Sequence, residues 1–269
     1  MYKRQGIAST IDFNFLLAID RPGQIYSSNN NGANWKIVYE EDTAGVFYDA
    51  IAFWDNKEGI AIGDPIGGCM SVVISRTGGQ SWEKLDCATL GPVVEGEAAF
   101  AASNSNIAIF EDHAWFVTGG AKARVFHTPN RGLDWEVFDT PILQGGQMTG
   151  IFSVDFWDEK NGIIFGGDWE NKNNNKGNKA ITKDGGKTWE LIADGEGPGY
   201  RSCIKYFPEG KAKQLIAVGI PGISISEDGG LHWKKISEES FYTLAFGDSR
   251  NEVWLAGDQK IGKLIWKEN

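Results

Sequence analysis

The sequence has few of the residues that build metal and redox sites, and it has no long apolar run. Its 269 residues include three histidines and three cysteines, and no Cys-x-x-Cys motif occurs. This scarcity argues against a zinc site and against an extensive disulfide framework, so we expect no metal and no cofactor. No stretch approaches the ~18 consecutive apolar residues of a membrane-spanning helix, so we expect no membrane span.

Positive charge is also scarce. Lysine and arginine together number 26 against 36 acidic residues, which gives a net charge of -10. Nucleic acid is bound mainly through basic side chains that neutralise phosphates, so nucleic acid is an unfavourable partner for this chain. An anionic membrane surface is disfavoured for the same reason, and no basic amphipathic stretch argues otherwise.

Glycine and tryptophan, by contrast, are frequent and periodic, with 35 and 11 copies. The pattern [ST]-x-[DNT]-x-G-x-x-W occurs five times, with successive tryptophans 47, 53, 54 and 44 residues apart. Repeats of this length with several strands per unit are typical of β-propeller blades. The five segments are 28–35, 75–82, 128–135, 182–189 and 226–233.

The chemistry of the repeated pattern is that of a tight turn. The Asp or Asn accepts hydrogen bonds from nearby backbone amides, and the Gly adopts a backbone conformation that other residues resist. The Trp then anchors the outgoing strand in apolar packing. We therefore assign a structural role to these residues: Asn30, Gly32, Trp35, Gly79, Trp82, Asn130, Gly132, Trp135, Asp184, Gly186, Trp189, Asp228, Gly230 and Trp233.

Outside this pattern each unit contains short β-rich runs separated by turn residues. No run of ten or more residues keeps helical periodicity. We predict one all-β domain over 1–269, a propeller of four-stranded antiparallel blades with six blades visible, the last lacking its fourth strand. A seventh, N-terminal blade is expected in the complete protein. The predicted blades span approximately 1–40, 46–87, 96–139, 149–193, 199–237 and 240–267.

The repeated pattern resembles the Asp-box, or bacterial neuraminidase repeat, of sialidases and sortilin-type receptors. The tandem D-G-G-x-x-W form and the blade spacing are most similar to bacterial relatives of the photosystem II assembly-factor family. That resemblance implies a seven-bladed, mostly exported propeller that binds partners instead of turning over substrate. We accordingly expect a non-catalytic protein of the periplasm, cell surface or exterior, although no signal peptide is visible.

Polar residues of separate blades are predicted to converge on one face of the propeller axis. Alignment of the first strands places Asp49, Glu97, Phe152, Arg201 and Tyr242 at one equivalent position. The turns between second and third strands add further charges to that face. The face is either a site for a protein, glycan or small ligand, or a solvated channel lining. The predicted ligand-binding residues are Asp49, Asp64, Glu97, Lys122, Arg124, Asp168, Tyr200, Arg201 and Tyr242.

Two enzymatic alternatives remain open. A glycoside hydrolase needs two carboxylates at a suitable separation, and the candidates are Asp49, Asp64, Glu97 and Asp168. Some bacterial relatives carry an oxidoreductase label, yet no cofactor motif is present. The run 195–199 is rich in glycine but is followed by no helix, so it reads as a loop between blades.

Two segments allow sharper expectations. Cys69 and Cys87 flank the hairpin of the second unit almost symmetrically, so they are predicted to lie within reach of a disulfide, which an exported protein could form. The Asn-rich stretch 168–178 connects two strands of the fourth unit. It is either a flexible surface loop or a contact loop, since loops often carry function.

Overall fold

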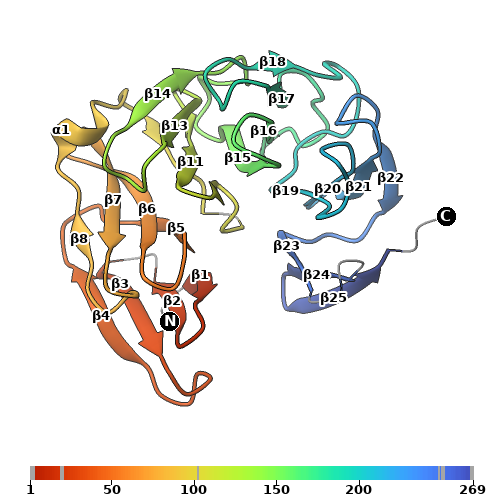
Figure 1. The fold of residues 1–269 in the computed structure, drawn as a ribbon. Helices are drawn as coiled ribbons and strands as arrows, with labels where there is room; N and C mark the ends of the chain where they lie inside the picture. The colour runs from red at the N-terminus through yellow and green to blue at the C-terminus, as the bar shows by residue number, and fades with distance from the viewer. Residues whose placement is uncertain (1–3, 19–20, 102, 248, 250–251, 267–269) are drawn as a thin grey trace.

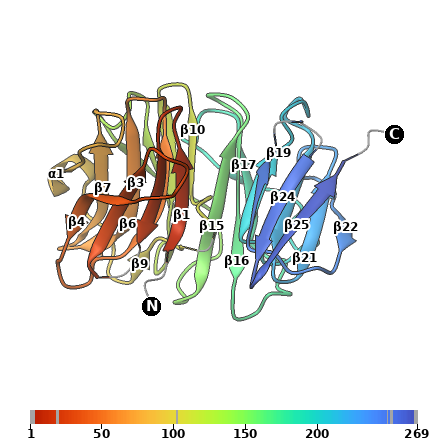
Figure 2. The same ribbon diagram turned by 90° about the horizontal axis from the view of Figure 1, so that it is seen from below.

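The computed structural model describes residues 4–18, 21–101, 103–247, 249 and 252–266, and nearly all their regular structure is β. Six sheets stand around a common axis in chain order, from β1–β4 in red to β23–β25 in blue (Figure 1). Seen from the side, the strands run from one face of the disc towards the other (Figure 2). The predicted all-β propeller fold is therefore confirmed. The ring is open between the first and the sixth blade (Figure 1).

Each blade is a meander in which consecutive strands pair antiparallel. The first two blades are β1 (Arg4–Ser9), β2 (Asn14–Ala18), β3 (Gly23–Ser28), β4 (Lys36–Glu41), and β5 (Tyr48–Phe53), β6 (Gly59–Ile66), β7 (Cys69–Ser75), β8 (Glu83–Lys84). The third and fourth are β10 (Ile107–Phe110), β11 (His113–Val117), β13 (Arg124–Thr128), β14 (Glu136–Asp139), and β15 (Thr149–Phe156), β16 (Gly162–Asp168), β17 (Lys179–Thr182), β18 (Glu190–Leu191). The last two are β19 (Cys203–Tyr206), β20 (Leu215–Gly219), β21 (Gly222–Ser226), β22 (Lys234–Ser237), and β23 (Thr243–Phe246), β24 (Glu252–Gly257), β25 (Lys260–Ile265).

The third and sixth blades depart from the regular plan. Two short strands, β9 (Glu97–Ala98) and β12 (Gly119–Gly120), pair with each other and join the sheet of the fourth blade beside β15. The first strand of the third blade is β10, so Glu97 precedes that strand and does not lie in it. The predicted equivalence of Glu97 and Asp49 is therefore wrong, because the segment that leads into β10 of the third blade is longer than the sequence alignment assumed. Among the described residues the sixth blade has three strands.

The repeated eight-residue pattern forms the same turn each time. In the fourth blade, Gly186 N donates to Thr182 Oγ1 (2.9 Å), Thr188 N donates to Asp184 Oδ1 (2.9 Å), and Trp189 Nε1 donates to Gly186 O (2.8 Å). Gly186 has a φ of +91°. A side chain there would be strained, and its Cβ would lie 3.3 Å from Trp115 of the preceding blade. The turns therefore fix both the hairpin and the contact between neighbouring blades.

The core lies between adjacent blades. Trp115 of β11 stacks on Phe156 of β15 with ring centroids 3.6 Å apart, and Trp189 meets Phe156 edge to face. Strand residues alternate between the two faces of each sheet, so an interior blade buries apolar side chains against both neighbours. No described residue covers the outward faces of the two end blades in this way, and Ile7 in β1 and Ile261 in β25 are exposed.

Cys69 and Cys87 form a disulfide with Cα atoms 5.6 Å apart. Cys69 is the first residue of β7, the strand that the hairpin pairing places beside β8. Cys87 does not continue the partner strand but begins the one-turn helix α1 (Cys87–Leu90), whose N-cap Asp86 accepts a hydrogen bond from Ala88 N. Cys203 is a free, buried cysteine.

Candidate functional site

The inner strands of the blades enclose a cavity on the propeller axis, which we call the axial cavity. Its volume is about 650 Å³, and side chains from β5, β10, β15, β19, β23, β24 and β25 line it. Ile7 of β1 also lines it, together with Trp254 and Ile261 of the sixth blade. The axial cavity therefore extends to the side where the ring is open (Figure 1). These three apolar side chains are 63%, 44% and 79% exposed.

A segment that precedes β10 runs through the middle of the propeller and lines the axial cavity. We call residues 103–105 the hub segment. Its side chains form hydrogen bonds with the inner strands or adjoining backbone of three other blades, so it links these blades at the centre of the propeller. The contacts are Ser103 Oγ to Ser202 O (2.7 Å), Ser105 Oγ to Ser153 Oγ (2.8 Å), Ile51 N to Asn104 Oδ1 (2.9 Å) and Asn104 Nδ2 to Ile51 O (3.2 Å).

The charged pair in the axial cavity is Asp155 and Lys205. Lys205 Nζ lies 2.8 Å from Asp155 Oδ1, and Tyr206 N donates to the other carboxylate oxygen. Burial lowers the pKa of Lys205, but the Asp155 carboxylate outweighs it and the net shift of that pKa is upward. Asp155 is the one acid among the described residues that line the cavity. Lys205 neutralises its charge. Because Asp155 is the one acid there, the described lining residues provide no second carboxylate of the kind that glycoside hydrolysis needs.

Glu97 and Arg124, two of the residues predicted from the sequence, form a buried ion pair. The Glu97 carboxylate accepts from Arg124 Nε (2.9 Å), Arg124 Nη2 (2.6 Å) and Thr118 Oγ1 (2.7 Å). The Glu97 side chain is fully buried. The pair joins β9 to β13, and both carboxylate oxygens of Glu97 accept hydrogen bonds from Arg124. Lys122 Nζ lies 3.2 Å from Asp139 Oδ2, and Lys122 does not line the axial cavity.

Asp64 is close enough to Asp49 for its charge to influence the Asp49 carboxyl, which is fully buried. Burial raises the pKa of Asp49 well above its ordinary value, and the Asp64 charge adds to this. Burial also raises the pKa of Asp64 to about 6, while a hydrogen bond from Ala99 N opposes the shift. Neither residue lines any of the four described cavities. The raised pKa values of Asp49 and Asp64 are therefore a consequence of burial and do not mark a site in one of these cavities.

The remaining predicted residues lie in or beside the fourth, fifth and sixth blades. Tyr200 is buried in an aromatic cluster, edge to face with Phe152 at 4.8 Å. Arg201 is buried next to it, and Tyr242 is 39% exposed. Asp168 accepts hydrogen bonds from Glu170 N and Asn171 N and so stabilises the turn that leaves β16. The structure does not gather these residues in the axial cavity, and their ligand-binding role stays a prediction.

The Asn-rich stretch 168–178 packs against neighbouring loops. Gly177 N donates to Asp194 Oδ1 (2.7 Å), and Asn178 Nδ2 donates to Pro198 O (2.9 Å). Tyr200 N donates to Lys172 O, which lies so close to Gly199 that a Cβ there would be 2.1 Å from it. The stretch therefore forms one wall of a pocket of about 340 Å³, which we call the basic pocket, together with residues of the fifth blade.

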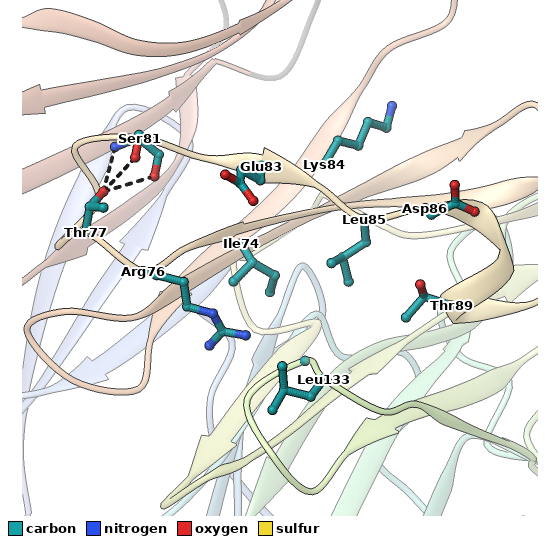
Figure 3. A pocket seen from close by; sticks show the side chains of 11 residues that line it. Ile74, Arg76, Thr77, Ser81, Glu83, Lys84, Leu85, Asp86, Thr89 and Leu133 are labelled. Atoms are coloured by element: carbon teal, nitrogen blue, oxygen red, sulfur yellow. Dashed lines mark hydrogen bonds between the residues drawn. The ribbon is translucent and has the colours of Figure 1, made fainter.

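A further pocket lies on the outer side of the second blade (Figure 3). It has a volume of about 400 Å³ and lies beside the second repeated turn. Arg76 points across it towards the third blade, where Arg76 Nη2 donates to Arg131 O (2.7 Å), and Arg76 Nη1 contacts Glu58 (2.5 Å). Arg131 in turn pairs with Asp55, Glu58 and Asp112. These arginines are engaged in joining blades.

Sequence reasoning missed both the hub segment and the axial use of Trp254 and Ile261. Serines and an asparagine in a loop give no distinctive signal, and only their position at the axis makes them important. The alternation of apolar residues in β24 and β25 was visible. What it did not reveal is that one face of this blade has no neighbouring blade among the described residues.

No known family profile matches the sequence, and no curated protein matches it significantly. Solved structures do match. A YCF48 bound to a D1 peptide superposes with a TM-score of 0.67 at 13% identity, over 99% of this chain and 78% of that chain. This chain has the β-propeller fold of YCF48. YCF48 from Cyanidioschyzon merolae gives a TM-score of 0.53 at 13% identity, over 98% of this chain and 95% of that chain.

An ancestral GH74 enzyme also shares the fold, with a TM-score of 0.66 at 14% identity over 99% of this chain. This chain spans 37% of the length of that enzyme. Among the described residues, no helix is long and apolar enough to cross a membrane. At these identities the likeness concerns the fold, so any function must be argued from the site.

Proposed function

We propose that this chain is a non-catalytic propeller scaffold that binds a segment of a protein partner in the axial cavity. The observation that carries the proposal is the largely apolar cavity at the propeller axis, which the inner strands line and which Ile7, Trp254 and Ile261 border. Exposed apolar surface around a concavity is typical of a binding site, and aromatic residues supply much of the energy of protein interfaces. The YCF48 structure that holds a D1 peptide supports a protein partner for this fold.

None of the predicted polar residues lines the axial cavity, so in this proposal any contact they make with a partner lies outside it, and the cavity itself supplies the binding surface. Lys122, Asp168 and Tyr242 are not fully buried and are available to contact a partner. Asp49 and Glu97 are buried, and we assign them to the scaffold. We also infer that the five repeated turns are Asp-boxes, which the recurring turn geometry supports. The disulfide between Cys69 and Cys87 supports export to an oxidising compartment.

The proposal is tested by selecting binders from a phage-displayed random peptide library and measuring the affinity of a labelled selected peptide by fluorescence anisotropy. Ile261→Asp places a charge on the cavity wall and is expected to weaken binding about tenfold or more, because it removes apolar contact. The matched control is Leu133→Asp, at an exposed leucine beside the outer pocket. Selected peptides that bind both variants equally well would contradict the proposal.

The glycoside hydrolase alternative makes a different prediction. An enzyme that uses the Asp49 and Asp64 carboxyls would release the chromophore from aryl glycosides, and Asp64→Asn would abolish this turnover. Retained turnover in that variant would exclude this pair as the catalytic acids. A glycan ligand without turnover would be detected on a glycan array and would compete with the selected peptides for the axial cavity.

A further inference from the structure

The basic pocket lies between the fourth and fifth blades, away from the axial cavity. Its walls are the stretch after β16, the loop before β19 and the outer strands of the fifth blade. Three of its side chains are cationic, and no carboxylate lines it among the described residues. The residues that matter for the argument are Lys172, Pro198, Arg201, Ser224, Trp233 and Lys235.

Arg201 is 2% exposed. Its Nη1 donates to Tyr200 O (2.8 Å) and its Nη2 donates to Ser224 Oγ (2.9 Å), whereas its Nε has no partner. Within the described part of the chain Arg201 forms no ion pair, and the carboxylate whose charge acts on it, Glu238, contacts Lys235 instead. A buried charge without a counter-ion is costly, so proteins usually pair it. The unpaired Nε proton and the second Nη2 proton together suit the two oxygens of one anionic group.

A second buried cation lies behind the pocket. Lys179 is fully buried, and its Nζ donates to Asn178 Oδ1, Ala193 O and Glu196 O at 2.9, 3.1 and 2.9 Å. All three acceptors are uncharged. Burial, together with the Arg201 charge, lowers the pKa of Lys179 to about 8, although the Asp194 and Glu196 carboxylates oppose the shift. The hydrogen-bond partners of the two buried cations are neutral, while the carboxylates of Asp194, Glu196 and Glu238 act on them only through longer-range charge interactions.

The pocket can also contact the body of an organic ligand. The Trp233 ring and the Pro198 ring line it, and both present apolar surface. Lys172 and Lys235 stand at its rim, where Lys235 contacts Glu238. The arrangement is one buried arginine at the base, two lysines above it and apolar side walls.

We propose that the basic pocket binds an oxyanion, a carboxylate or a phosphate, with Arg201 as its principal ligand. The group accepts from Arg201 Nε and Nη2, while Lys172 and Lys235 attract it from solvent. This site is separate from the axial cavity, so the proposal does not depend on the proposed function. It accounts for an arginine that is buried, only partly hydrogen-bonded and without a counter-ion.

The test is an NMR titration of isotope-labelled protein with inorganic phosphate, acetate and phenylacetate. The shifts expected on binding are those of Arg201 Nε, Trp233 Nε1 and the backbone amides of the stretch after β16. A preference for phosphate over the two carboxylates identifies a phosphate ligand, and the opposite preference an organic acid. Arg201→Gln is expected to weaken binding about ten- to hundredfold, because it removes hydrogen bonds from a charged donor.

The matched control is Arg21→Gln, at an exposed arginine of the first blade, which is expected to leave binding unchanged. Lys172→Gln and Lys235→Gln keep the proposal testable if Arg201→Gln does not fold, since each removes only a rim charge. Each is expected to weaken binding several-fold. The proposal is overturned if none of the three anions binds the wild-type protein, or if binding is the same in the folded variants of the pocket as in the wild type.

Discussion

Thr243 Oγ1 donates a hydrogen bond of 2.8 Å to the backbone carbonyl of Ser103, a residue 140 positions earlier in the chain. Thr243 begins the inner strand of the sixth blade, and Ser103 belongs to the hub segment. The bond therefore connects the sixth blade to the hub segment. On its opposite side, the sixth blade borders the opening between it and the first blade (Figure 1). The hub segment makes comparable contacts to the second, fourth and fifth blades, which gives the open ring a central support.

The first prediction concerns this support. Thr243→Val removes the hydroxyl and leaves the Ser103 carbonyl without that donor, so the free energy of unfolding should fall by about 1 kcal/mol. The control is Ser9→Ala, which removes an exposed hydrogen bond to Asn14 and should have a much smaller effect. Urea denaturation of both variants measures the difference. Equal losses of unfolding free energy in the two variants would show that the hub contact stabilises the fold no more than an ordinary surface hydrogen bond does.

The second prediction concerns the buried pair of Glu97 and Arg124. Glu97→Gln leaves the arginine without its counter-ion and should lower the free energy of unfolding by roughly 3–5 kcal/mol. Arg124→Met alone should be comparably damaging. The double variant should recover much of the loss, because no buried charge is then left unpaired. A double-mutant cycle measures the coupling, and strictly additive losses would argue against a direct energetic link.

The third prediction follows from the raised pKa of Asp64. The folded protein holds the Asp64 proton up to about pH 6, whereas the ordinary value is 3.8. Folding therefore takes up a proton between these values, and this group makes the folded state less favourable as the pH rises through that range. At pH 7, Asp64→Asn should be more stable than the wild type by roughly 1–3 kcal/mol.

The measurement is urea denaturation of wild type and Asp64→Asn at several pH values. The stability advantage of the variant should shrink as the pH falls from 7 towards 4, because the wild-type carboxyl then becomes neutral as well. Asp49→Asn should show the same direction, since burial also raises the pKa of Asp49. A difference between variant and wild type that does not change with pH would contradict the assignment.

The fourth prediction concerns the disulfide. Cys69 and Cys87 are separated by 18 residues, so breaking their bond should cost about 2–4 kcal/mol of stability. The double variant Cys69→Ser, Cys87→Ser should unfold at a lower temperature than the oxidised wild type and should not respond to reductant. Cys203→Ala retains the disulfide, so its midpoint should still fall on reduction. Thermal unfolding with and without reductant measures both, and a wild-type midpoint that reductant leaves unchanged would contradict the prediction.

The sequence by itself determined the fold, because the repeated turn and the alternation within strands are local. Thr182, Asp184 and Gly186 form their hydrogen bonds within a few residues, so a pattern of eight residues is enough to predict them and their spacing gives the blade period. The placement of Cys69 beside Cys87 followed from the same hairpin geometry.

Only the tertiary structure decided which polar residues meet. Glu97 lies in an added strand beside the fourth blade and is neutralised by Arg124, whereas the sequence alignment had placed it on the axis. Ser103 is important because it lies in the hub segment, and Arg201 is important because its buried Nε has no hydrogen-bond partner. Such contacts join residues of different blades. The repeat pattern carries no information on how segments outside it, such as β9 and the hub segment, pack against the blades.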